Sequence, residues 1–106
     1  MPADAVVARL RDIPDGGLLG AALPDGTRIV LVRRGDRVTA LADSCPHQAM
    51  PLSSGELLPN GAVECPWHGA RFDCETGRCR MGPATDDVAT YPVTVDAQGQ
   101  VRVATR

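Results

Sequence analysis

Two short segments in the middle of the chain each place a cysteine beside a histidine, and they constrain the fold more than any other feature. The first is Cys45-Pro46-His47, and the second, separated from it by seventeen residues, is Cys65-Pro66-Trp67-His68. Proline fixes φ and lacks an N–H, so each segment favours a tight turn that aims both donors at one centre. Two thiolates and two imidazoles suit either one tetrahedral zinc ion or a two-iron cluster. The sequence therefore predicts a metal centre at Cys45, His47, Cys65 and His68.

Length and composition predict one small domain that benefits from such a centre. The chain has 106 residues, of which 43% are hydrophobic and 23% charged, as in a soluble globular protein. Trp67, Phe72 and Tyr91 are its only aromatic residues, so the core must be mainly aliphatic. A small core of this kind gains stability from a metal.

Charge and hydropathy exclude several classes of function. All eleven basic residues are arginine and the net charge is −2, so no basic face for nucleic acid is expected. No stretch approaches the ~18 apolar residues of a membrane span, and the N-terminus lacks the apolar run of a signal peptide. We therefore expect a cytoplasmic protein, where cysteines bind metal or stay reduced rather than form disulfides.

The two ends of the chain have the pattern of short β-strands separated by turns. The expected strands are residues 5–10, 18–23, 28–33, 37–42, 91–95 and 101–103, with turns around Pro24-Asp25-Gly26 and Asp96 to Gly99. Residues 44–87 contain both histidines, all four cysteines and five of the nine prolines. The predicted architecture is a single all-β domain over residues 1–106: an antiparallel sandwich or small barrel with an inserted, loop-rich metal subdomain.

The ligand segments and their surroundings resemble Rieske-type [2Fe-2S] ferredoxins. The resemblance rests on Asp43-Ser44 before the first box, on Gly69 to Asp73 after the second, and on Thr76-Gly77, Gly82-Pro83-Ala84 and Tyr91-Pro92-Val93 in that order. It implies that Cys45 and Cys65 bind the inner iron, that His47 and His68 bind the outer iron, and that Gly82-Pro83 forms a loop shielding the cluster.

The resemblance also implies a function. The chain would be a one-electron carrier without catalytic activity, taking electrons from a flavin-dependent NAD(P)H reductase and passing them to the terminal non-haem iron oxygenase of a multicomponent aromatic-ring system. Two alternatives remain open at this point. One is the small Rieske subunit of an assimilatory nitrite reductase, and the other is a zinc-stabilised interaction module without redox activity.

The resemblance further predicts a potential at the low end of the Rieske range. Two neutral histidines leave the oxidised centre without net charge, which raises the potential to about −150 to +300 mV, against about −400 mV for plant-type ferredoxins. High-potential relatives carry an extra disulfide and hydroxyl donors to the cluster. The corresponding residues here are Met50 and Trp67, then Ala70 and Phe72, which cannot supply them.

Other residues of the middle region are expected to be structural. Cys74 and Cys79 flank a turn and are expected to be small buried thiols, with a cross-strand disulfide as the alternative. Trp67 and Met50 are expected to cover the cluster. The acidic residues Asp73, Glu75, Asp86 and Asp87 are expected to be solvated charges, with docking to a basic partner as the alternative.

Overall fold

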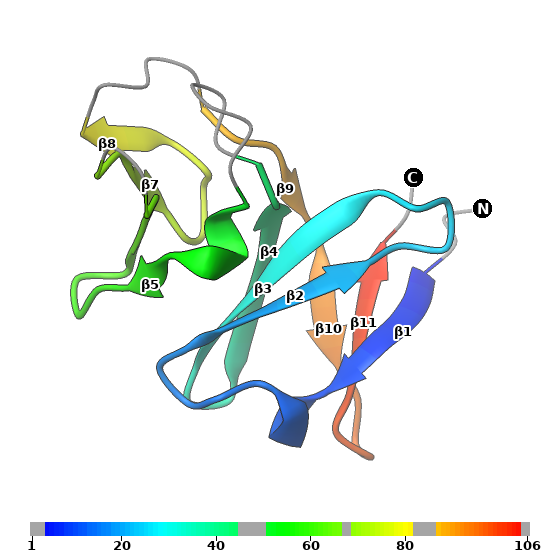
Figure 1. Cartoon of the computed structure of the whole chain (residues 1–106). Coiled ribbons are helices and arrows are strands. Elements are labelled where there is room, and N and C mark those ends of the chain that lie inside the picture. Colours follow the sequence, from blue (N-terminus) through cyan, green and yellow to red (C-terminus); the bar gives the residue numbers. More distant parts are fainter. Residues whose placement is uncertain (1–3, 45–50, 67–68, 82–86, 105–106) are drawn as a thin grey trace.

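The computed structural model describes residues 4–44, 51–66, 69–81 and 87–104, and within them the chain forms three antiparallel sheets (Figure 1). A central sheet lies between the other two, and each of its faces is covered by one apolar core. The prediction of an all-β, antiparallel fold is confirmed.

The central sheet has the strand order β2-β3-β4-β9, with bounds Leu18–Ala22, Arg28–Arg34, Arg37–Ala42 and Thr90–Tyr91. The strands predicted over residues 28–33 and 37–42 are present as β3 and β4, and they form a hairpin that pairs Val30 with Leu41 and Leu31 with Ala40. Successive side chains of a strand point to opposite faces, so Val30 and Leu41 enter one core while Leu31 and Ala40 enter the other. β3 is therefore buried on both faces, which explains its continuous run of aliphatic residues.

The second sheet, of order β1-β11-β10, closes a sandwich with the central sheet. Its strands are β1 (Asp4–Arg9), β11 (Gln100–Ala104) and β10 (Val93–Val95), and a 3-10 turn, η1 (Leu10–Asp12), follows β1. The core between these two sheets is aliphatic. It consists of Ile13, Leu23, Ile29, Leu31, Val38, Ala40, Val101 and Val103. We call this part of the molecule the sandwich.

The third sheet, of order β5-β6-β7-β8, lies against the other face of the central sheet. Its strands are β5 (Glu56–Leu57), β6 (Ala62–Glu64), β7 (Arg71–Asp73) and β8 (Cys79–Met81), preceded by a 3-10 turn, η2 (Leu52–Ser54). We call this sheet with η2 the cluster subdomain. The sequence predicted a loop-rich insertion here and missed the sheet, because strands of two or three residues are too short to show alternation.

The strand predicted over residues 91–95 is divided in two by the structure. Thr90 and Tyr91 pair with β4 in the central sheet, whereas Val93 to Val95 pair with β11 in the second sheet. Pro92 lies between them and has no N–H to donate to either ladder. The proline therefore stands where the chain crosses from one sheet to the other.

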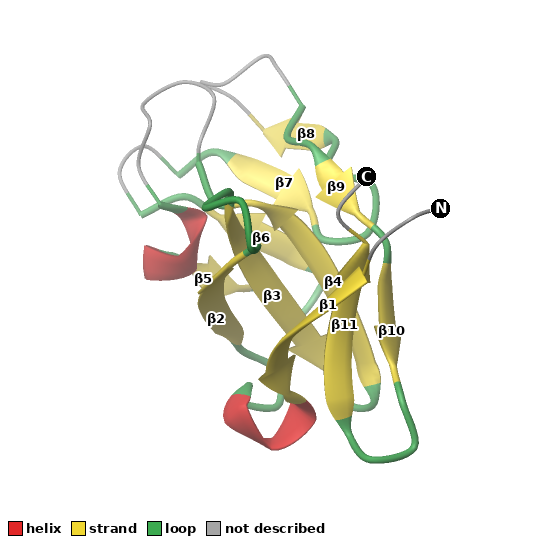
Figure 2. Ribbon diagram, turned by 90° about the vertical axis from the view of Figure 1, so that its right-hand side faces the viewer, coloured by secondary structure: helices red, strands yellow, loops and turns green. Residues whose placement is uncertain are grey.

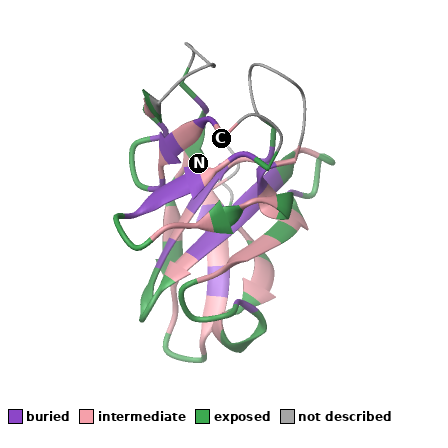
Figure 3. Ribbon diagram, turned by 60° about the vertical axis from the view of Figure 1, so that its left-hand side comes forward, coloured by how far each residue is buried: buried purple, intermediate pink, exposed green. Residues whose placement is uncertain are grey.

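Burial follows the three-sheet arrangement. Figure 3 shows the buried segments in purple running along the inner strands, with exposed segments concentrated in the turns. Among the described residues, no helix has the length and hydrophobicity needed to cross a bilayer.

Candidate metal centre

Cys65 is the one predicted ligand that falls within the described residues. Cys45, His47 and His68 lie outside them, as do Met50, Trp67 and Gly82-Pro83. The described residues that adjoin these positions nevertheless define how the chain approaches the centre.

Cys65 follows β6 directly and begins a tight turn. Its N–H donates to the carbonyl of Ala70 at 2.7 Å, and its carbonyl accepts the N–H of Gly69 at 3.2 Å. Gly69 has a φ of +73°, a left-handed conformation that favours glycine. These two hydrogen bonds bring the two ends of the second ligand box together.

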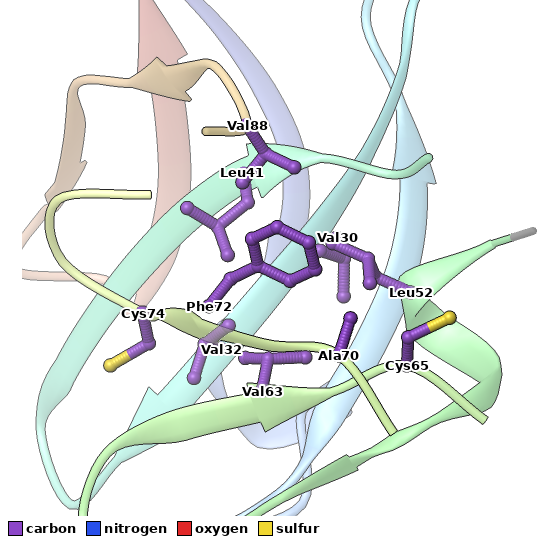
Figure 4. Packing of buried hydrophobic residues seen from close by; sticks show 10 residues of the cluster. All are labelled: Val30, Val32, Leu41, Leu52, Val63, Cys65, Ala70, Phe72, Cys74 and Val88. Atoms are coloured by element: carbon purple, nitrogen blue, oxygen red, sulfur yellow. The ribbon is translucent and has the colours of Figure 1, made fainter. Parts of the chain in front are cut away.

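The Cys65 side chain suits an iron ligand. It is 1% exposed and forms no disulfide. Figure 4 shows it beside Leu52 and Ala70 at the edge of an apolar cluster, with its sulfur directed away from the Phe72 ring. Iron in a [2Fe-2S] cluster is held by thiolates, two of which are replaced by imidazoles in the Rieske type. A buried, unoxidised thiol directed out of the core, in a chain that offers a second cysteine and two histidines, fits that group.

Asp43 fixes the chain on both sides of the first ligand box. It follows β4, is 6% exposed, and its N–H donates to the carbonyl of Arg28 at 3.1 Å. Its carboxylate accepts two hydrogen bonds from Ser53 in η2, one from the N–H at 2.7 Å and one from the hydroxyl at 2.6 Å. The end of β4 and the start of the cluster subdomain are thereby held together.

Contacts of η2 continue this connection to the second box. Leu52 is fully buried in the same apolar cluster as Cys65. Gly55 ends η2 so close to β6 that a Cβ on it would lie 1.9 Å from the Glu64 carbonyl oxygen. Glu64 in turn pairs with Arg71 at 3.0 Å, on the two strands that flank the second box.

Described residues on either side of Gly82-Pro83 in the sequence contact one another. The Asp87 carboxylate accepts the N–H of Cys79 at 2.8 Å, and the N–H of Val88 donates to the Gly77 carbonyl at 2.9 Å. Gly77 has a φ of +73°, and a Cβ there would lie 2.1 Å from the Val88 carbonyl oxygen. Only glycine allows this approach.

Described residues next to the two ligand boxes and to Gly82-Pro83 meet in one apolar cluster. In sequence, Leu52 follows the first box, Cys65 and Ala70 lie at the ends of the second, and Val88 follows Gly82-Pro83, and all four are buried in that cluster. Figure 2 shows the described stretches next to the two ligand boxes and to Gly82-Pro83 together in the upper part of the molecule, beside β7 and β8.

The other cysteines behave as structural residues. Cys74 is 1% exposed and carries no disulfide, and its sulfur accepts a weak hydrogen bond from Arg34 at 3.8 Å. Cys79 is half-buried against the same apolar cluster. The structure shows no disulfide between Cys74 and Cys79, and the expectation of a buried residue holds for Cys74 but not for the half-buried Cys79.

The acidic residues near the cluster subdomain are engaged within the chain. Glu75 pairs with Arg37 at 2.7 Å, and Asp73 pairs with Arg80. Partial burial by itself would raise the pKa of Asp73, but hydrogen bonds from the N–H groups of Glu75 and Thr76 and from Arg80 hold it below its usual value. These contacts favour a structural role for Asp73, Glu75 and Asp87 over docking, and Asp86 lies outside the described residues.

Sequence reasoning gave Asp43 no role, although it noted the residue as part of the motif. The only signal in the sequence is its position, directly after a predicted strand and two residues before a predicted ligand. Its partner Ser53 could not be identified, because nothing in the sequence shows that η2 folds back onto the end of β4.

Comparisons with known proteins agree with the site. The Rieske [2Fe-2S] domain family matches residues 4–92. The ferredoxin component of the naphthalene 1,2-dioxygenase system of Pseudomonas aeruginosa is 37% identical over 95 residues, covering 90% of this chain and 88% of that protein. The solved ferredoxin of carbazole 1,9a-dioxygenase from Nocardioides aromaticivorans IC177 is 31% identical with a TM-score of 0.89, covering 98% of this chain and 99% of the other. A second solved structure, a complex of reduced oxygenase and oxidised ferredoxin in carbazole 1,9a-dioxygenase, matches at 30% identity with a TM-score of 0.85, covering 95% of this chain and 92% of the matched chain.

The chain belongs to the Rieske [2Fe-2S] family. Its cofactor is a Rieske-type [2Fe-2S] cluster, and its function is that of a Rieske ferredoxin, an electron carrier. Similarity to a dioxygenase ferredoxin over nearly the whole of both chains supports this interpretation over a nitrite reductase subunit or a zinc module.

Proposed function

We propose that Cys45, His47, Cys65 and His68 hold the cluster, with both cysteines on one iron and both histidines on the other. We further propose that the protein carries single electrons from a flavin-dependent NAD(P)H reductase to a terminal non-haem iron oxygenase in the cytoplasm and catalyses no reaction itself. The observation that carries this proposal is Cys65, a buried thiol outside any disulfide, in the apolar cluster that also contains Leu52, Ala70 and Val88.

The chemistry follows from the donor set. When bound, the cluster supplies a one-electron couple whose oxidised form is neutral with two thiolates and two neutral imidazoles. The protein surrounds Cys65 with apolar side chains. Ala70 and Phe72, both fully buried, offer the cluster sulfurs no hydroxyl donor. Donors of that kind would stabilise the reduced, more negative state, so their absence supports a potential at the low end of the Rieske range.

The partners are inferred from relatives. The similar proteins are named as ferredoxin components of dioxygenase systems, and one solved structure is a complex of a ferredoxin with its oxygenase. These names support an oxygenase as the electron acceptor. A reductase donor follows from the need to re-reduce the carrier after each transfer.

A matched pair of cysteine variants tests the ligand assignment. Cys65 and Cys74 are both 1% exposed and lie in the same apolar cluster, and Figure 4 shows their sulfurs on opposite sides of it. Cys65→Ser is expected to abolish binding of iron and acid-labile sulfide, whereas Cys74→Ser keeps both. Retention of the full cluster in Cys65→Ser would refute the assignment.

A histidine variant tests the charge argument. His68→Cys replaces a neutral ligand with an anionic one, so an intact cluster is expected to have a lower midpoint potential in protein-film voltammetry. An unchanged or higher potential would contradict the argument.

A further inference from the structure

We propose that Asp43 and Ser53 form a positioning pair that fixes the first ligand segment, and that the buried Asp43 carboxylate lowers the reduction potential of the cluster. This inference rests on the proposed function, because it assumes that Cys45 and His47 are ligands. It adds to that function a residue that touches no iron and still tunes the electron transfer.

The placement of Asp43 carries the first half of the inference. Asp43 and Ser53 stand on either side of the segment that contains Cys45 and His47, and their side chains are joined by two short hydrogen bonds. Ser53 belongs to η2, which Leu52 anchors in the apolar cluster and Gly55 sets against the carbonyl of Glu64, the residue before Cys65. A continuous set of contacts thus runs from the end of β4, through the carboxylate and η2, to the second ligand box.

Close packing around the carboxylate adds to this evidence. Gly20 of β2 lies over the pair, and a Cβ there would lie 3.1 Å from the Ser53 hydroxyl and 3.5 Å from an Asp43 carboxylate oxygen. The pair is therefore enclosed by β2, the end of β4 and η2. Rotation of the Asp43 side chain would break both hydrogen bonds to Ser53.

The second half of the inference, the effect on the reduction potential, rests on the charge of Asp43. The carboxylate is 6% exposed, and no arginine in the described part of the chain forms an ion pair with it. Its two hydrogen bonds both come from a neutral residue. Asp43 is two residues from Cys45, so their Cα atoms are at most about 7 Å apart. A buried negative charge at that range opposes the addition of an electron to the cluster.

Two variants distinguish the charge from the hydrogen bonds. Asp43→Asn removes the charge and keeps an oxygen that can accept the Ser53 N–H, so the midpoint potential is expected to rise. Ser53→Ala keeps the charge and removes one donor that offsets it, so the potential is expected to fall or stay the same. A purely structural role would not produce a rise in one variant without a rise in the other.

The control is Asp96→Asn, in the turn between β10 and β11. Asp96 also accepts hydrogen bonds from backbone N–H groups, but it belongs to the sandwich, remote from the cluster subdomain. The midpoint potential of the Asp96→Asn variant is expected to match that of the wild-type protein. Line widths in the electron paramagnetic resonance (EPR) spectrum of reduced Ser53→Ala should broaden if the ligand segment loses its fixed position, and those of Asp96→Asn should not.

The measurements are protein-film voltammetry and EPR on protein carrying its cluster, with thermal unfolding of the cluster-free protein to report the loss of the pair itself. Equal potentials in wild type and Asp43→Asn, or a rise in Ser53→Ala as large as in Asp43→Asn, would overturn the inference. If Asp43→Asn does not fold, the Ser53→Ala result is sufficient by itself. A midpoint potential of Ser53→Ala above that of the wild type would overturn the inference. Failure of the proposed function is distinct, because wild-type protein would then show no Rieske signal at all.

Discussion

The core of the sandwich and the core of the cluster subdomain lie on opposite faces of β3, yet the two regions are held together in different ways. In the sandwich, β1 and β11 pair over five or six residues and the core is purely aliphatic. In the described part of the cluster subdomain no strand exceeds three residues, and the core includes Cys65, Cys74, Ala70 and Phe72. Individual contacts replace long ladders there, such as Asp43 to Ser53, Asp87 to Cys79 and Gly77 to Val88.

The two regions therefore differ in what stabilises them. Long ladders and aliphatic burial stabilise the sandwich. The cluster subdomain relies on a few single contacts between described residues that adjoin the ligand boxes and Gly82-Pro83 in sequence. We infer that the bound cluster completes its stability, as a structural metal does in other small domains.

The largest expected loss of stability comes from truncating a buried side chain in either of the two apolar cores. Phe72→Ala empties the centre of the cluster-subdomain core and is expected to reduce the free energy of unfolding by about 3–5 kcal/mol, while Leu31→Ala in the sandwich costs about 2–5 kcal/mol. Urea unfolding measures both. Iron content distinguishes them, because Phe72→Ala should bind less cluster and Leu31→Ala should bind the normal amount. Equal loss of iron in the two variants would contradict the view that cluster binding depends on the core of the cluster subdomain and not on that of the sandwich.

Two turn glycines sharpen the comparison. Gly77 and Gly99 have φ values of +73° and +77°, and the carbonyl of each accepts a backbone N–H, from Val88 and Leu10 respectively. Alanine at Gly99 meets nothing within 4 Å and is expected to cost only the left-handed strain, about 1–2 kcal/mol. Alanine at Gly77 clashes with the Val88 carbonyl and is expected to cost about 1–3 kcal/mol more. Chemical denaturation of both variants measures the loss in the free energy of unfolding. Equal losses would show that the close approach of Gly77 to the Val88 carbonyl does not matter for stability.

Two aspartates give the pH dependence. Asp73 and Asp96 each begin a hairpin turn, and each has a lowered pKa. For Asp96 the N–H of Gln100 is the main cause, and for Asp73 the hydrogen bonds outweigh the opposing effect of burial. A lowered pKa contributes stability that is complete above the unfolded value of 3.8 and is lost as pH falls through the folded value. Urea unfolding from pH 6 to pH 2 is expected to show a weaker acid dependence in Asp73→Asn and in Asp96→Asn than in wild type. An unchanged slope in either variant would show that its carboxylate does not contribute.

The smallest effect is expected at Arg37, one of two arginines that form ion pairs with Glu75 between the two regions. Arg37 of β4 contacts Glu75 in the turn between β7 and β8, and both side chains are well exposed. Arg37→Ala should change the free energy of unfolding by about 0.2–1 kcal/mol, and less at high salt. A larger loss would mean that the regions depend on this pair rather than on β3, which lies between their cores.

The sequence was informative wherever residues form regular patterns. The strands β3 and β4 followed from their apolar and β-branched residues, whereas the assignment of Cys45, His47, Cys65 and His68 as ligands stays a prediction from their spacing. The family and its cofactor, confirmed by the comparisons, came from the same motif.

Features that depend on contacts between distant residues could not be predicted. The sheet of the cluster subdomain is made of strands too short to be recognised, and the break at Pro92 depends on which sheet each side of it joins. The pairing of Asp43 with Ser53 arises only when η2 folds onto the end of β4. Local propensity carries no information about such tertiary contacts.

The central claim is that two thiolates and two imidazoles hold a single two-iron cluster, and EPR of the dithionite-reduced protein tests it most directly. The mixed nitrogen and sulfur ligand set predicts a signal with a low average g-value, distinct from that of an all-cysteine cluster. A spectrum of the all-cysteine type, or protein that contains no iron or acid-labile sulfide after anaerobic reconstitution, would contradict the claim.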